Sequence, residues 1–130
     1  MLFRFGRAGA NVRIVEGDWY AALPESLRGT VDVIVANPPY IARDDTAVEA
    51  SVVDYEPHRA LYAGNDGLDA IRTVIGNASA WLRPKGVLVC EIGHGQGDAV
   101  RELMAAAGLR DPEVRQDLSG RDRIALARSS

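Results

Sequence analysis

The run Val31–Ala36 is short and largely β-branched, and it ends abruptly at Asn37-Pro38-Pro39-Tyr40. β-branched side chains favour strands. Consecutive prolines cannot continue a hydrogen-bonded ladder, because they have no backbone N–H. The sequence therefore predicts a strand over Val31–Ala36, buried on both faces, that stops at a rigid turn.

Other strands are predicted where apolar residues alternate or run together between glycine, proline or aspartate. Val12–Asp18 alternates apolar and polar residues and ends at a Gly-Asp pair, which favours a first strand. The last two predicted strands are separated only by Ser119-Gly120, which indicates an antiparallel hairpin. The predicted strands are Val12–Asp18, Val31–Ala36, Gly86–Ile92, Glu113–Asp117 and Arg123–Ala127.

Helical spacing of apolar residues predicts helices over Leu68–Leu82, with Asp66 as N-cap, and over Asp98–Ala107 before Gly108. Ile41–Gly67 has no sustained period and reads as a long loop. Strands alternating with helices indicate an α/β fold with a mainly parallel sheet and a C-terminal antiparallel hairpin. Ligands of such sheets bind beyond the C-terminal ends of the strands.

Composition favours one soluble domain of 130 residues, with 47% hydrophobic and 25% charged residues. The net charge of −3 provides no overall positive charge to attract a nucleic-acid backbone, so no direct nucleic-acid partner is expected. No apolar stretch approaches the ~20 residues of a membrane span. The single cysteine, Cys90, reads as a buried strand residue, and a cytoplasmic location is expected.

The Asn37-Pro38-Pro39-Tyr40 turn suits chemistry on an amide nitrogen. Such a nitrogen is a poor nucleophile, so a site that methylates it must hold both N–H groups while the donor approaches. Asn37 offers a side-chain carbonyl oxygen, Pro38 offers a main-chain carbonyl, and Tyr40 offers a flat face for packing. A methyl donor that is a sulfonium ion leaves as a neutral group, so the transfer itself requires no metal. In addition, His58 and His94 lack the spacing that is typical of metal ligands.

The same tetrapeptide has two other interpretations. One is a strand that simply ends in a rigid turn, as Pro-Pro produces in any context. The other is a Pro-Pro-x-Tyr-like ligand for small recognition domains, which needs an exposed extended segment rather than a strand end.

The sequence closely resembles the release-factor glutamine N5-methyltransferases, the family known as HemK or PrmC. Matching motifs occur along nearly the whole chain, which makes the resemblance far more specific than the tetrapeptide alone. They are Gly17-Asp18-Trp19, Val35–Ile41, Tyr55–Leu61, Gly64–Leu68, Glu91–Gly97 and Asp117–Arg123.

The resemblance implies S-adenosylmethionine as the donor and the glutamine of the Gly-Gly-Gln motif of peptide chain release factors as the substrate. Asn37 and Pro38 would hold the glutamine amide as catalytic groups, and Pro39 and Tyr40 would complete the substrate site. Asp18, Trp19 and Asn37 would contact the cofactor, with Asp18 beside its adenine end.

Members of the family also carry a glycine-rich cofactor loop and an N-terminal helical domain, and neither is found in this sequence. The Gly93–Gly97 run follows a different strand and is not that loop. The resemblance therefore implies a truncated Rossmann-like class I methyltransferase fold that lacks the first two strands. Residues 1–130 would form a partial catalytic domain, with a poorly matched start at 1–10, impaired activity and dimerisation through an exposed sheet edge.

Two alternatives stay open. The first is a methyltransferase for adenine or cytosine amines in nucleic acid, which uses a similar turn on a flipped base. The second is a non-catalytic binding module that contacts a release factor or a partner chain supplying missing strands.

Overall fold

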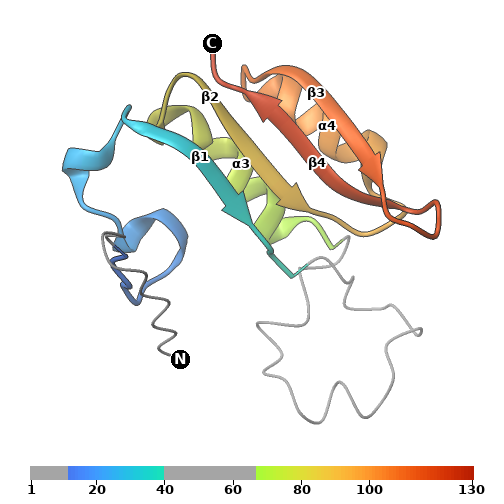
Figure 1. The fold of residues 1–130 in the computed structure, drawn as a ribbon, viewed down its shortest axis with the longest axis horizontal. Coiled ribbons are helices and arrows are strands. Elements are labelled where there is room, and N and C mark those ends of the chain that lie inside the picture. The colour runs from blue at the N-terminus through green and yellow to red at the C-terminus, as the bar shows by residue number, and fades with distance from the viewer. Residues whose placement is uncertain (1–11, 40–66) are drawn as a thin grey trace, which may run out of the picture.

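One four-stranded sheet, in the order β1-β2-β4-β3, organises the part of the chain that the structure describes, residues 12–39 and 67–130. The structure is a computed structural model. Figure 1 shows the α-helices together on one side of this sheet. The elements are two 3₁₀ turns, η1 (Trp19–Ala22) and η2 (Glu25–Leu27), strand β1 (Val31–Ala36), helix α3 (Asp69–Trp81), strand β2 (Leu82–Glu91), helix α4 (Gly97–Ala106), and strands β3 (Arg110–Gln116) and β4 (Asp122–Arg128).

The strand pairing confirms the α/β class and the C-terminal hairpin. β1 runs parallel to β2, with Val33 opposite Val87 and Val35 opposite Val89. β4 pairs antiparallel with both β2 and β3. Within the described residues, the parallel character of the sheet is thus confined to the β1–β2 ladder.

The core lies between the sheet and the two helices. α3 and α4 cover the same face of the sheet, because their apolar stripes meet the alternate side chains that β2 and β4 turn toward them. No helix in the described ranges is long and apolar enough to cross a membrane. The main buried residues are Ile71, Val74, Ile75, Ala78, Leu88, Cys90, Val100, Met104, Ala125 and Ala127.

The predicted strand over Val12–Asp18 is wrong. These residues form no strand, and Val12 and Ile14 are 64% and 47% exposed. An alternating pattern gives a strand only when a neighbouring strand accepts its backbone hydrogen bonds. No neighbour is present among the described residues, so the segment stays irregular.

The prediction that Val31–Ala36 is buried on both faces is also wrong, although the strand itself is confirmed. β1 is the edge of the sheet, and Val33 and Val35 are 53% and 76% exposed on the face opposite α3 and α4. A β-branched run signals a strand but does not show how many neighbours it has. The predicted N-cap Asp66 and most of the predicted long loop lie outside the described residues.

The turn between β3 and β4 is held by one carboxylate. Asp117 accepts hydrogen bonds from the backbone N–H of Ser119 (2.9 Å), the Ser119 hydroxyl (2.6 Å) and the backbone N–H of Arg121 (3.1 Å). These bonds, that of the Ser119 side chain first, lower the pKa of Asp117 from 3.8 to about 2. Gly120 takes φ +81°, a conformation that glycine adopts without strain.

This turn makes stability depend on pH. Because the folded-state pKa of Asp117 is depressed, its contribution is present above pH ~4 and is lost as the pH falls toward 2. We expect Asp117→Asn, which cannot ionise, to show a smaller drop in melting temperature than the unchanged chain between pH 5 and pH 2. Melting temperatures measured by circular dichroism at half-unit steps of pH test this expectation. An equal dependence of the melting temperature on pH in the two proteins would contradict it.

Cys90 is buried in β2, as predicted. Burial, followed by the negative charge of Glu91, raises the pKa of its thiol to about 12. We therefore expect Ellman's reagent to leave the folded protein unlabelled and to label one thiol per chain in urea. Rapid labelling in the absence of urea would show that β2 opens readily.

Candidate functional site

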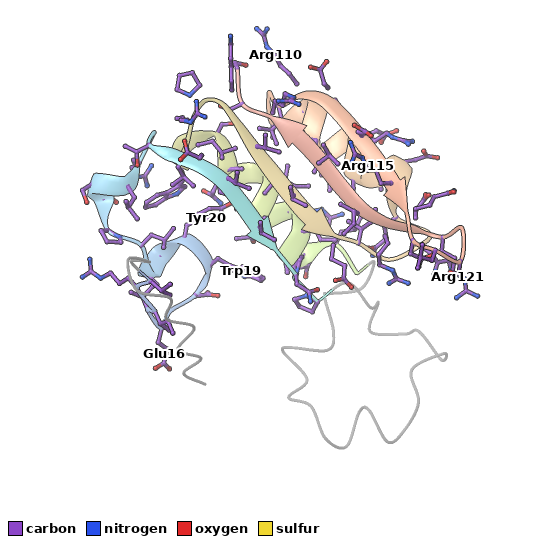
Figure 2. All side chains as sticks on the ribbon, in the orientation of Figure 1. Glu16, Trp19, Tyr20, Arg110, Arg115 and Arg121 are labelled. Atoms are coloured by element: carbon purple, nitrogen blue, oxygen red, sulfur yellow. The ribbon has the colours of Figure 1, made fainter. Side chains whose placement is uncertain are left out.

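A cavity of about 270 Å³ lies at the C-terminal end of β1. Asn37 is exposed there, while Pro38 is fully buried and Pro39 is half-buried. In Figure 2, Trp19 extends from η1 toward this end of β1. The lining residues come from η1, β1 and α3 together with the positions that follow η1 and β1: Trp19, Tyr20, Leu23, Ile34, Val35, Ala36, Asn37 and Val74.

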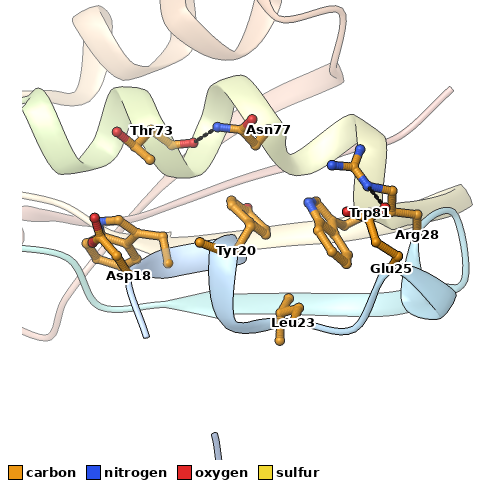
Figure 3. Close-up of a pocket in the computed structure, with 10 residues that line it drawn as sticks. Asp18, Tyr20, Leu23, Glu25, Arg28, Thr73, Asn77 and Trp81 are labelled. Atoms are coloured by element: carbon orange, nitrogen blue, oxygen red, sulfur yellow. Dashed lines mark hydrogen bonds and ion pairs between the residues drawn. The ribbon is translucent and has the colours of Figure 1, made fainter. Parts of the chain in front are cut away.

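A second cavity of about 310 Å³ adjoins the first and shares Trp19, Tyr20 and Leu23 with it. Asp18 and Glu25 contribute carboxylates to its wall. Figure 3 shows its lining side chains between the η1–η2 segment and α3. The remaining lining residues are Ala21, Arg28, Thr73, Asn77 and Trp81.

Tyr20 and Trp81 fix the η1–η2 segment to α3. Their rings stack with centroids 5.8 Å apart and planes 14° from parallel, and the Tyr20 hydroxyl donates to the Val74 carbonyl over 2.7 Å. Burial, and then the nearby Cys90 thiol, raises the pKa of Tyr20 to about 12, so its hydroxyl stays a donor. The Arg28 guanidinium lies 4.8 Å from the centroid of the Trp81 ring. These contacts hold the shared wall of both cavities in place.

The turn that presents Asp18 and Trp19 is tightly constrained. A Cβ on Gly17 would lie 2.3 Å from the Ala22 Cβ, so only glycine fits there. Trp19 has φ +50°, a left-handed conformation that is uncommon for a bulky residue. Backbone strain of this kind collects at binding sites, where the surrounding structure enforces it.

Gln96 joins the end of β2 to the start of α3. Its side-chain oxygen accepts from the Gly93 N–H at 2.9 Å, and its amide nitrogen donates to the Gly67 carbonyl at 3.2 Å. A Cβ on Gly97 would lie 2.7 Å from a carboxylate oxygen of Asp122. Gly97 therefore lies close to the side chain of Asp122 at the start of β4.

The structure brings together some of the predicted site residues. Trp19 and Asn37 line one cavity, and Asp18 lines the adjoining one. Pro38 is buried directly after Asn37, and Tyr40 lies outside the described residues.

Sequence reasoning missed Tyr20, Leu23 and Trp81, which line these cavities. Trp81 lies seven residues after Val74 and three after Ala78, so it belongs to the apolar stripe of α3 and was recognisable from helical spacing.

No family model matches the chain. The chain is 47% identical over 122 residues to a release factor glutamine methyltransferase of Burkholderia pseudomallei, covering 94% of this chain and 42% of that protein. It is 53% identical over 112 residues to one of Cereibacter sphaeroides, covering 85% and 39%. A crystal structure of the release factor-specific protein-(glutamine-N5) methyltransferase of Alicyclobacillus acidocaldarius superposes with a TM-score of 0.48 at 27% identity, covering 76% of this chain and 48% of that one.

The match to these relatives extends over most of this chain but only part of theirs. The chain spans about two fifths of the length of the two relatives from Burkholderia and Cereibacter. At such identity over so much of its length, the chain belongs to the release factor glutamine methyltransferase family, an enzyme family.

Proposed function

We propose that this chain provides the amide-binding part of an S-adenosylmethionine-dependent methyltransferase whose substrate is the glutamine of the Gly-Gly-Gln motif in peptide chain release factors. The observation that carries the proposal is that Asn37, at the end of β1, shares a cavity with Trp19. The relatives' names support release factor glutamine as the target. Because the chain matches about two fifths of those proteins, its activity is tested within a full-length relative.

The substrate amide is held by acceptors at the end of β1. The Asn37 side-chain oxygen takes one N–H and the Pro38 carbonyl takes the other, so the nitrogen is oriented for in-line attack. When bound, S-adenosylmethionine supplies an electrophilic methyl group and leaves as a neutral thioether. The positive charge of the reaction departs as a proton from the amide nitrogen. A bound substrate that lacks these N–H groups covers the two acceptors and leaves them unpaired, at roughly 1–3 kcal/mol each.

The donor is assigned to the two adjoining cavities. Trp19 offers an aromatic face, and the Asp18 carboxylate accepts from the exocyclic amine of adenine. The exposed position of both side chains, and the turn at Gly17 that fixes them, support this assignment. We place the reaction in the cytoplasm, where a buried thiol such as Cys90 stays reduced.

A chimaera tests the donor site. This chain replaces the matching 122 residues of the Burkholderia pseudomallei relative, and S-adenosylmethionine is titrated into the chimaera by calorimetry. We expect micromolar binding that Trp19→Ala weakens about tenfold, since loss of a stacked ring removes ~1–3 kcal/mol. Leu118→Ala, at an exposed position in the distant β3–β4 turn, is the matched control. If the Trp19→Ala chimaera binds S-adenosylmethionine as tightly as the unchanged chimaera does, Trp19 is not part of the donor site.

A further inference from the structure

The β3–β4 turn, residues 117–121, lies at the same edge of the sheet as Asn37. β1 and β2 are parallel and β4 is antiparallel to β2 and β3, so the ends of β1, β2 and β3 share this edge with the start of β4. The Ile92 N–H donates to the Arg123 carbonyl at 2.8 Å, which joins the end of β2 to the start of β4. We call this edge the rim, and it consists of Asn37, residues 93–96 and the β3–β4 turn.

The proposed donor cavities lie on one side of Asn37. Their walls come from η1, η2, α3 and β1, and Figure 1 shows the η1–η2 segment beyond β1, on the side away from β2, β4 and β3. In-line transfer of a methyl group places the nucleophile opposite the leaving sulfur. An amide that reaches Asn37 therefore comes from the side where the rim continues across β2 to the β3–β4 turn.

The β3–β4 turn is close enough to contact a polypeptide whose glutamine lies at Asn37. Neighbouring strands are about 4.7–4.9 Å apart and β4 is two strands from β1, so the start of β4 lies roughly 10 Å from the end of β1. Because an extended chain spans about 3.3–3.6 Å per residue, a residue about three or four positions from the glutamine reaches the turn.

The middle of the rim is open to solvent within residues 12–39 and 67–130. His94 and Gly95 in the loop after β2 are exposed. A Cβ built on Gly95, or on Gly120 in the turn, would lie in open space. The described part of the chain therefore leaves room for a polypeptide to lie along the rim from Asn37 to the turn.

The turn presents one apolar and one cationic side chain. Leu118 is fully exposed, and Figure 2 shows Arg121 at the tip of the hairpin. Arg121 takes part in none of the ion pairs found among the described residues. A single exposed leucine is common on protein surfaces, so its exposure alone indicates no binding. Its place on the rim, beside an unpaired cation, is what distinguishes Leu118.

Asp117 holds this turn in one conformation. Besides its bonds to Ser119 and to the Arg121 N–H, its carboxylate lies 3.5 Å from Nε of Arg123, and its own N–H donates to the Arg121 carbonyl at 2.8 Å. A loop that is already ordered loses little conformational entropy when a partner binds. The turn is therefore preorganised as a contact point.

We infer that the β3–β4 turn docks the polypeptide substrate of the Asn37 site, with Leu118 packed in an apolar recess of that polypeptide and Arg121 paired with one of its carboxylates. The inference rests on the proposed function, which makes the substrate a protein and sets the side from which it approaches. A nucleic acid fits the turn less well, because the carboxylates of Asp117 and Asp122 flank Arg121 in the sequence and repel phosphates.

Binding of a release factor to the chimaera tests the docking without turnover. A release factor that carries a fluorophore is titrated with the chimaera in the absence of S-adenosylmethionine, and fluorescence anisotropy gives the dissociation constant. The test variants are Leu118→Ser and Arg121→Glu. Arg128→Glu is the matched control, because Arg128 is an exposed arginine at the other end of β4, about 20 Å from the turn.

We expect Leu118→Ser and Arg121→Glu each to raise the dissociation constant at least about tenfold, as loss of an anchoring residue in an interface does. Arg128→Glu makes the same change in net charge as Arg121→Glu and should stay within about twofold of the unchanged chimaera. Circular dichroism confirms that the variants fold.

A short peptide separates docking from the amide site. A capped peptide with the Gly-Gly-Gln motif and two residues on each side of the glutamine does not reach the turn. The Leu118→Ser and unchanged chimaeras should therefore methylate this peptide at equal rates. A slower rate with Leu118→Ser would show that the turn acts on the amide site itself, and the docking inference would be wrong.

Three binding results would also overturn the inference. They are no binding of the release factor to the unchanged chimaera, an unchanged dissociation constant in both test variants, and an equal loss of affinity in Arg128→Glu. Failure of the proposed methyl transfer would appear as an unmethylated peptide and would leave the binding results unaffected, because anisotropy does not report catalysis.

Discussion

Asn37→Ala in the chimaera is expected to lower kcat/KM for a release factor by about 100- to 1,000-fold, as loss of one preorganised polar group in a reaction site does. Alanine removes the side-chain oxygen that is proposed to hold one N–H of the glutamine amide. Asn37→Asp keeps an oxygen at that place and should retain more activity than Asn37→Ala. Initial rates with radiolabelled S-adenosylmethionine measure both variants.

The matched control is Gln116→Ala, which removes an exposed side-chain amide from β3, at the opposite edge of the sheet from β1. It should leave kcat/KM unchanged. If Asn37→Ala also stays within about twofold of the unchanged chimaera, the side chain of Asn37 does not hold the substrate, and the proposed site is wrong.

Trp81→Ala is expected to lower the free energy of unfolding by about 3–5 kcal/mol, as aromatic truncation in a core does. Trp81 is 3% exposed, stacks on Tyr20 and lies beneath the Arg28 guanidinium. Its loss should also release the η1–η2 segment from α3 and enlarge the second cavity. Urea unfolding followed by circular dichroism gives the free energy.

Two controls frame this prediction. Trp81→Phe keeps a ring against Tyr20 and should recover most of the loss, while Leu118→Ala removes an exposed side chain and should change stability by less than about 0.5 kcal/mol. If Trp81→Ala lowered the free energy of unfolding by less than about 1 kcal/mol, the stacked aromatic pair would not be what anchors η1 and η2.

Most secondary structure was predictable because the deciding signals are local. The apolar stripe of α3, the prolines after β1 and the glycine that follows α4 each act within a few residues. The same holds for the turn at Asp117, where a short polar side chain caps nearby backbone groups.

What failed depends on neighbours that are distant in sequence. Val12–Asp18 has a strand pattern, yet it finds no strand to pair with among the described residues. Val33 and Val35 have the composition of a buried strand, yet β1 is an edge. Whether a strand lies inside a sheet is decided by tertiary pairing, which a local pattern does not encode.

The candidate site was predictable only in part. Asn37 and Trp19 were singled out from motifs, and the structure places them in one cavity. The part that Tyr20 plays was not foreseen, because its hydroxyl reaches Val74, 54 residues away in the sequence.

Tandem mass spectrometry of a release factor incubated with the chimaera and S-adenosylmethionine tests the central claim most directly. We predict one added methyl group on the glutamine side chain of the Gly-Gly-Gln motif, and at most trace methylation with the Asn37→Ala chimaera over the same incubation. Methylation at another residue, or equal methylation with and without the Asn37 side chain, would contradict the proposed amide site.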